Sequence, residues 1–199
     1  MKRHLRTAVV LLALVAGVAW SATSGRADAM APQAAAGAWR IDPARSVVQF
    51  AITKLGYEAV TGVFRESEGE ILYDPAHPSA SSIRWRVKIA SVLTDASNRD
   101  RTLQSEEYFD AARHPFLSFV SREVLESGAG ILDVSGDITI RGVTRPLTLS
   151  VRPHVTEAGP TFETDFTIDR YAFGVVGGTF FGRLIGRQAR VHLFAATAR

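Results

Sequence analysis

The chain has 199 residues, of which 46% are hydrophobic and 22% charged, and it contains no cysteine. The missing cysteines exclude disulfides, a thiol nucleophile and haem attachment through a CxxCH motif. The net charge is +3, but residues 30–199 carry 19 basic and 19 acidic residues. The basic excess therefore belongs to the first residues, and we expect no nucleic-acid partner.

Residues 1–29 have the pattern of a secretory signal peptide. Basic residues precede an apolar run at 8–20, and Ala27-Asp28-Ala29 fits a cleavage site. An uncleaved anchor is the alternative, although an apolar run of 13 residues is short for a membrane span. We expect a periplasmic protein with no stable membrane anchor after cleavage. Residues 30–38 are small and are expected to be disordered, and one domain is expected at 39–197.

From Trp39 onward, apolar and polar residues alternate, which predicts half-buried antiparallel strands. Gly62 and Gly69 are expected at bends or bulges of one long strand. The segment 132–140 is expected to form a hairpin with 147–151 through the sequence RGVTRP. In chain order the expected strands are 48–52, 57–73, 83–89, 116–120, 132–140, 147–151, 162–168 and 189–195.

The strand IRWRVKI at 83–89 places Arg84, Arg86 and Lys88 on one face. These residues form either a binding stripe or a solvated outer face. Such alternation is ordinary in antiparallel sheets, so the solvated face is favoured.

About eight antiparallel strands fit either a sandwich or a closed barrel. Strand length and internal glycines at 62, 69 and 136 favour an all-β barrel, because a closing sheet must curl. The interior of such a barrel is filled by side chains or holds one small ligand. The pattern alone leaves both possibilities open.

Residues 95–112 interrupt the strand pattern with a short helical insert. Asp95 or Asn98 is expected to cap a first turn, and Ser105 a second. The insert is expected to lie across one end of the barrel, its aromatic residues closing the interior and Arg99, Asp100 and Arg101 facing the rim. The alternative is a plug whose Arg–Asp pair only fixes the loop.

The sequence shows no catalytic motif, and we expect no enzyme, no cofactor and no metal site. His77, His114, His154 and His192 are not within metal-ligand spacing of one another. The enzyme alternative is a small hydrolase or isomerase acting on a lipid-like substrate. Its polar groups would be Arg99, Asp100 and Arg170.

Several motifs resemble the YceI-like family of polyisoprenoid-binding proteins. They are TDASNRDRTLQSEEYFDAARHPFLSFVS at 94–121, GDITIRGVTRPLTL at 136–149 and RYAFG at 170–174. The similarity covers residues 39–196 in the expected order. It implies an extended lipocalin-like barrel with an apolar cavity for a long isoprenoid chain, and an insert at the cavity mouth.

The alternation and the resemblance together predict the ligand site. The rim, or head-group, residues are Arg99 and Asp100. Thr102 stands where the family often has histidine, and Ser67 where it often has an aromatic residue. The expected cavity-lining residues are Phe50, Ile52, Phe64, Trp85, Val87, Leu103, Phe109, Phe119, Ile138, Ile140, Phe166 and Phe173.

The function predicted from this site is that of a periplasmic carrier holding a polyisoprenoid lipid, such as a polyprenyl phosphate or an isoprenoid quinone. Burial of the chain would drive binding, because each methylene contributes about 0.8 kcal/mol. A filled barrel that serves as a stress-related protein-interaction module is another alternative. The sequence leaves the oligomeric state open, a homodimer included.

Overall fold

The computed structural model describes residues 36–54, 57–178 and 185–199, and it confirms an all-β fold with one short α-helix. The helix is α1 (Ser97–Gln104), and three 3₁₀ turns are η1 (Pro78–Ala80), η2 (Ile89–Ser91) and η3 (Arg170–Phe173). The strands are β1 (Gly37–Ile41), β2 (Val47–Lys54), β3 (Tyr57–Phe64), β4 (Ser67–Tyr73), β5 (Ser82–Lys88), β6 (Val92–Leu93), β7 (Phe116–Gly128), β8 (Ile131–Ile140), β9 (Val143–Thr156), β10 (Gly159–Asp169) and β11 (Ile185–Ala198).

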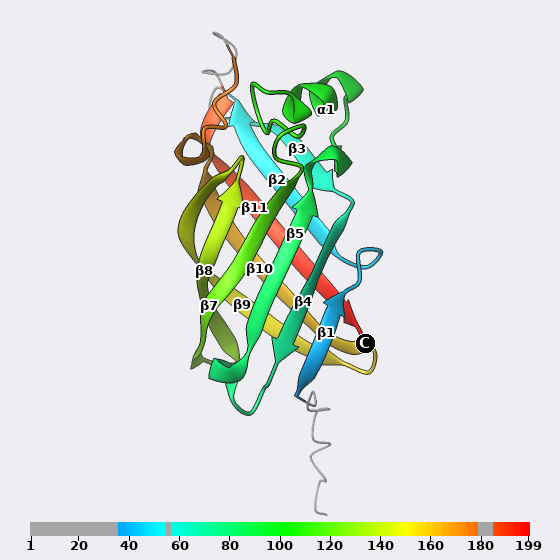
Figure 1. Cartoon of the computed structure of the whole chain (residues 1–199), viewed down its shortest axis with the longest axis vertical. Helices are drawn as coiled ribbons and strands as arrows, with labels where there is room; N and C mark the ends of the chain where they lie inside the picture. The colour runs from blue at the N-terminus through cyan, green and yellow to red at the C-terminus, as the bar shows by residue number, and fades with distance from the viewer. Residues whose placement is uncertain (1–35, 55–56, 179–184) are drawn as a thin grey trace, which may run out of the picture. The chain divides into compact units, whose positions relative to one another are not determined.

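The segments form a closed antiparallel barrel of eight strands, because three of the barrel strands are each split in two. β1 and β2 both pair with β11 and together make the first barrel strand. β3 and β4 make the second, and β5 and β6 make the third. The remaining strands β7 to β11 follow as neighbours in chain order, as Figure 1 shows.

Closure occurs where the last strand meets the first. Ile41 of β1 lies opposite Thr197 of β11, and the Asp42 amide donates to the Ala196 carbonyl at 2.9 Å. Because β11 pairs with β1, neither of these two strands is left as a free edge of the described sheet.

The hairpin between β8 and β9 is confirmed. Its two turn residues, Arg141 and Gly142, have φ angles of 50° and 73°, as a two-residue hairpin turn with positive φ requires. The expected barrel strand at 57–73 is interrupted between β3 and β4, at Arg65 and Glu66, so it is not one continuous strand.

Of the bends or bulges expected at Gly62 and Gly69, the bulges are wrong, because both residues keep regular pairing, Gly62 with Phe50 and Gly69 with Trp85. At these positions glycine provides room for a close neighbour. A Cβ at Gly69 would lie 3.0 Å from the Trp85 Cα, which is too close for a packed carbon. A register shift instead occurs in β7 just after Ser121, the partner of Gly136.

The basic residues of β5 belong to a solvated outer face with carboxylate partners. Arg86 pairs with Glu68, and the Lys88 ammonium lies 2.8 Å from the Glu66 carboxylate, both partners coming from the β3–β4 region. All four side chains are well exposed, so each pair contributes little to stability.

The first strand starts earlier than expected. Gly37 and Ala38, assigned to a disordered tail from their small size, pair with Tyr73 and Leu72 of β4. Backbone hydrogen bonds do not need large side chains, so a prediction based on small residues placed the start of the first strand too late. The signal peptide expected at 1–29 and the tail up to 35 lie outside the described residues. Within the described part of the chain, no helix is long and apolar enough to cross a membrane.

The insert is one helix followed by turns. α1 begins after Ala96, which makes no side-chain cap, so the expected caps at Asp95 and Asn98 are wrong. The helix is instead attached to the residue that follows β6, because the Asp100 carboxylate accepts hydrogen bonds from the Thr94 amide at 2.8 Å and from the Thr94 hydroxyl at 2.7 Å. Ser105, expected to start a second helical turn, is the carboxyl-terminal cap of α1.

Candidate functional site

The barrel contains an apolar cavity of about 260 Å³. This volume approaches the lower end of small-molecule pockets, about 300 Å³, and far exceeds the roughly 30 Å³ of one water molecule. All twelve residues expected to line a cavity do so: Phe50, Ile52, Phe64, Trp85, Val87, Leu103, Phe109, Phe119, Ile138, Ile140, Phe166 and Phe173.

The strand pattern explains how these side chains converge. In β5, Ile83, Trp85 and Val87 line the cavity, while the basic residues between them face outward. The same alternation occurs in β9, β10 and β11. The prediction from sequence named too few cavity-lining residues in these three strands. The lining residues missed there include Leu147, Leu149, Val151, Phe162, Val191, Leu193 and Ala195. Their alternation was visible in the sequence, and extending it to every strand would have found them.

Aromatic residues join the insert to the barrel wall at one end of the cavity. The Phe50 and Phe64 rings are 5.7 Å apart, and the Phe109 ring meets Phe64 edge-on at 6.1 Å. Leu103 also packs against this core. The insert therefore lies at one end of the barrel, as expected (Figure 1), and its apolar side chains pack against the core.

Hydrogen bonds attach the insert to the neighbouring loops. Arg141, in the β8–β9 turn, donates to the carbonyls of Gly174 and Glu106, the latter at 2.7 Å. The Gly177 amide donates to the Glu107 carbonyl at 3.1 Å. The cavity mouth is thus built from three segments that lie far apart in the sequence.

Bulky side chains close the interior near β1. The Tyr73 and Phe162 rings pack edge-on at 5.2 Å, and Trp39 is buried beside them in the same core. Burial raises the pKa of the Tyr73 phenol above its ordinary value, which keeps this group neutral. Figure 1 shows β1 toward the end of the barrel opposite α1.

Arg99 supplies a cationic group at the cavity mouth. It lines the cavity, its side chain is one-third exposed, and it pairs with the exposed carboxylate of Asp95. Thr102, one of the departures from the family pattern, also lines the cavity, and its hydroxyl donates to the Asn98 carbonyl at 2.9 Å. Ser67, the other departure, is not among the described lining residues.

Asp100, expected beside Arg99 at the rim, is not among the described residues that line the cavity. Its carboxylate is instead engaged by Thr94, which joins α1 to the end of β6. Adjacent positions on a helix point about 100° apart, so Arg99 and Asp100 cannot share one direction.

Arg170 also lines the cavity, but its guanidinium is hydrogen-bonded to backbone carbonyls of the fold. The side chain is 5% exposed, and it donates to the carbonyls of Val175 at 2.6 Å, Ile185 at 2.9 Å and Gly186 at 2.8 Å. It also stacks on Tyr171 at 4.6 Å. Arg170 therefore connects η3 and its following loop to the start of β11.

Among the described residues that line the cavity, the charged side chains are Arg99 and Arg170. Since Arg170 is committed to backbone carbonyls, Arg99 is the charged group better placed to meet a ligand. The arrangement can bury an apolar chain inside the barrel and present one guanidinium at the mouth.

Comparisons with known proteins give a consistent family. The YceI-like domain matches residues 39–196. A UPF0312 protein of Pseudomonas savastanoi pv. phaseolicola is 37% identical over 127 residues, which are 63% of this chain and 66% of that relative. The chain thus spans slightly less than two thirds of the relative's length.

Two solved structures share the fold. BcnA of Burkholderia cenocepacia has a TM-score of 0.74 at 23% identity, covering 78% of this chain and 98% of BcnA. A polyisoprenoid binding domain from Saccharophagus degradans, implicated in plant cell wall breakdown, has a TM-score of 0.61 at 15% identity. That alignment covers 79% of this chain and 95% of the domain.

Proposed function

The chain belongs to the YceI-like domain family, and from this premise we propose that its barrel is a periplasmic carrier that binds a polyisoprenoid lipid. The observation that carries the proposal is the apolar cavity of about 260 Å³ inside the barrel. The structurally similar polyisoprenoid binding domain of Saccharophagus degradans supports the ligand class. The signal-peptide pattern at residues 1–29 supports the compartment.

The cavity suits the slender chain of such a lipid. Its wall is made mainly of aliphatic and aromatic side chains from every part of the barrel ring, so burial of an apolar guest does not depend on directional contacts along its length. Each methylene transferred from water contributes about 0.8 kcal/mol, and several isoprene units therefore supply a large driving force. The length of the bound chain is limited by the volume of the cavity.

Arg99 is proposed to contact the polar head group. A guanidinium offers paired donors that match a phosphate, and such charge-assisted bonds are stronger than neutral ones. Its present partner, Asp95, has a side chain that is 85% exposed, so a phosphate can replace it at little cost. A polyprenyl phosphate is therefore favoured over an uncharged polyprenol.

The cavity argues against the alternative of a filled barrel, since a barrel packed by its own side chains leaves no such volume. The enzyme alternative needs reactive polar groups at the cavity. Asp100 and Arg170, two of its three expected groups, instead hold Thr94 and backbone carbonyls. We therefore propose binding without chemistry.

The first experiment is solvent extraction of the purified protein followed by mass spectrometry, together with uptake of added polyprenyl phosphate. Co-purified isoprenoid, or saturable uptake at one chain per barrel, is expected. The proposal would be contradicted if no lipid co-purified and no added chain were taken up. Recovery of chemically altered lipid would instead favour the enzyme alternative.

A second experiment tests the head-group contact by comparing polyprenyl phosphate with polyprenol. Arg99→Ala is expected to weaken binding of the phosphate about tenfold or more, and that of the alcohol little, because a charge-assisted bond is lost. Arg101→Ala is the matched control, since Arg101 is exposed on the same helix and is not among the described lining residues. An equal loss for both ligands would show that Arg99 only fixes the insert.

A further inference from the structure

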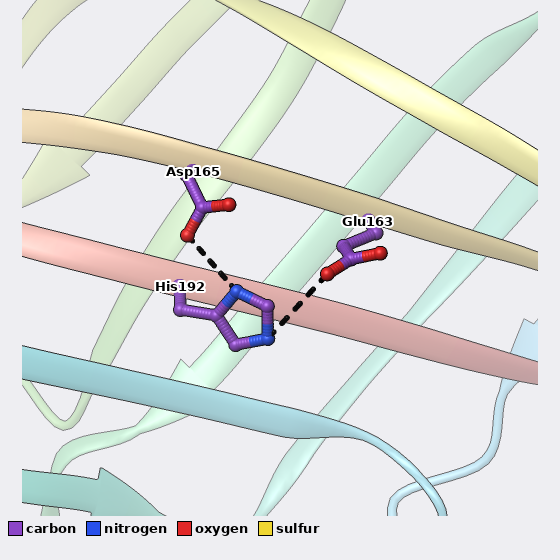
Figure 2. A group of neighbouring side chains, drawn as sticks. All are labelled: Glu163, Asp165 and His192. Carbon is purple, nitrogen blue, oxygen red and sulfur yellow. Dashed lines mark hydrogen bonds and ion pairs between the residues drawn. The ribbon is translucent and has the colours of Figure 1, made fainter.

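Three side chains that do not line the cavity meet on the outer surface of the barrel wall. Glu163 and Asp165 lie two residues apart on β10, and His192 on the neighbouring β11 is the register partner of Asp165. Residues two apart on a strand share a face, and a cross-strand partner adds a third side chain to it. Figure 2 shows the imidazole between the two carboxylates.

This face is the outer one. Thr164 between the two acids, and the next residues Phe166 and Leu193, line the cavity. Glu163, Asp165 and His192 therefore point away from it. Their side chains are 38%, 69% and 38% exposed, which gives a dissolved ion free access. A ligand bound here is therefore separated from the cavity by the barrel wall.

The three side chains lie close enough together for one ligand atom of each to approach a common ion. His192 Nδ1 lies 3.0 Å from Asp165 Oδ1, and His192 Nε2 lies 4.0 Å from Glu163 Oε1. One ligand atom from each residue can be chosen so that all three lie within 4.8 Å of one another. Zinc binds nitrogen and carboxylate oxygen at about 2.0–2.2 Å and takes one nitrogen of an imidazole, so these exposed side chains must rotate to place one His192 nitrogen and both carboxylates around one ion.

We propose that Glu163, Asp165 and His192 form a site for a divalent transition-metal ion of the zinc class. Two carboxylates balance the charge of the ion, and an imidazole nitrogen favours zinc and its neighbours over calcium or magnesium, which prefer all-oxygen sites. Water completes the coordination, as expected for three protein ligands on an open surface. Binding requires the coordinating nitrogen of His192 to be unprotonated, so a proton at that nitrogen competes with the ion.

The ion would tie β10 to β11, the strand through which the barrel closes on β1 and β2. An ion that binds the folded chain and lacks a preformed site in the unfolded chain raises the melting temperature with its concentration. The site thus acts as a surface clip across two strands. Histidine spacing along the sequence did not indicate it, because the ligands come from strands that are distant in the chain.

The test uses tag-free, chelator-treated protein titrated with Zn²⁺ by calorimetry and by thermal unfolding. One saturable equivalent is expected, with a rise in melting temperature. Glu163→Gln keeps the shape of the side chain and should weaken binding about tenfold or more, since even the loss of residues behind metal ligands has such effects. His192→Ala should abolish the saturable binding.

The matched control is His77→Ala. His77 is an exposed histidine that lies 3.3 Å from one carboxylate, that of Asp74. It does not belong to the cluster of Glu163, Asp165 and His192. This variant should bind Zn²⁺ like the unaltered protein. Absence of a saturable equivalent, or unchanged affinity in a folded Glu163→Gln variant, would overturn the proposal. Uptake of polyprenyl phosphate by Glu163→Gln should be unaltered, which separates this site from the cavity.

Discussion

The Phe50 ring lies over Gly62, its cross-strand partner, so closely that a Cβ atom at position 62 would stand 2.7 Å from the ring Cε1. An aromatic ring thereby covers the bare backbone of a glycine inside the barrel. Phe50 also lines the cavity and packs against Phe64. The small residue on one strand thus fixes the position of a cavity-lining ring on the next.

Gly62→Ala is expected to displace the Phe50 ring and so reshape the cavity. Overpacking of this kind costs about 1–3 kcal/mol of unfolding free energy, and uptake of an isoprenoid chain should fall. Thr61→Ala, at an exposed neighbouring position, is the control. Urea denaturation and lipid uptake measure the two effects. Unchanged uptake in Gly62→Ala would show that the ring position does not limit the cavity.

Asp100→Ala is expected to loosen the insert. The carboxylate accepts two hydrogen bonds from Thr94, and bonds to a charged acceptor contribute about 1.5–3 kcal/mol each. We expect a loss of at least about 1.5 kcal/mol in urea denaturation and faster amide exchange at Thr94. Asp95→Ala, which removes an exposed partner of Arg99, should cost less than about 1 kcal/mol. Equal losses would mean that Asp100 has no special part in holding α1.

Arg170→Lys is expected to destabilise the loop that follows η3 although the charge is kept. An ammonium cannot reproduce the planar fork that reaches the Val175, Ile185 and Gly186 carbonyls together. A carbonyl left buried without a donor costs about 1–3 kcal/mol, so a loss of on the order of 3 kcal/mol is expected in the free energy of unfolding. A melting temperature equal to that of the unaltered protein would contradict this role.

Barrel closure is expected to weaken in acid through Asp42. The Arg45 side chain hydrogen-bonds the Asp42 carboxylate and lowers its pKa below the ordinary value of 3.8, and Arg45 also donates to the Thr197 carbonyl at 2.7 Å. A lowered pKa in the folded state gives stability that is present above pH 3.8 and is lost as the pH falls through the folded value.

Arg45→Ala should therefore lower the free energy of unfolding more at pH 6 than at pH 3. The Thr197 bond does not depend on the carboxylate, so its part of the loss should persist at pH 3. Urea denaturation of both proteins at the two pH values measures the difference. The prediction is wrong if the loss is the same at both.

The period-two alternation determined much of this protein. A strand must send successive side chains to opposite faces, so a sequence that alternates specifies which residues share a surface before any strand is paired. Trp85 and Val87 could be assigned to the interior for that reason, and Arg86 to the outside. The motifs shared with the YceI-like family added the insert at the cavity mouth, where Phe109 packs on Phe64.

Only the tertiary structure decided the contacts that link distant segments. Arg99 and Asp100 are adjacent, yet one lines the cavity and the other holds Thr94, because packing against the barrel sets the rotation of α1. Glu163 and His192 meet only because β10 and β11 pair in one register, and a shift of one residue would put them on opposite faces. Alternation along a strand is a local property of the backbone, whereas register and helix rotation depend on long-range packing.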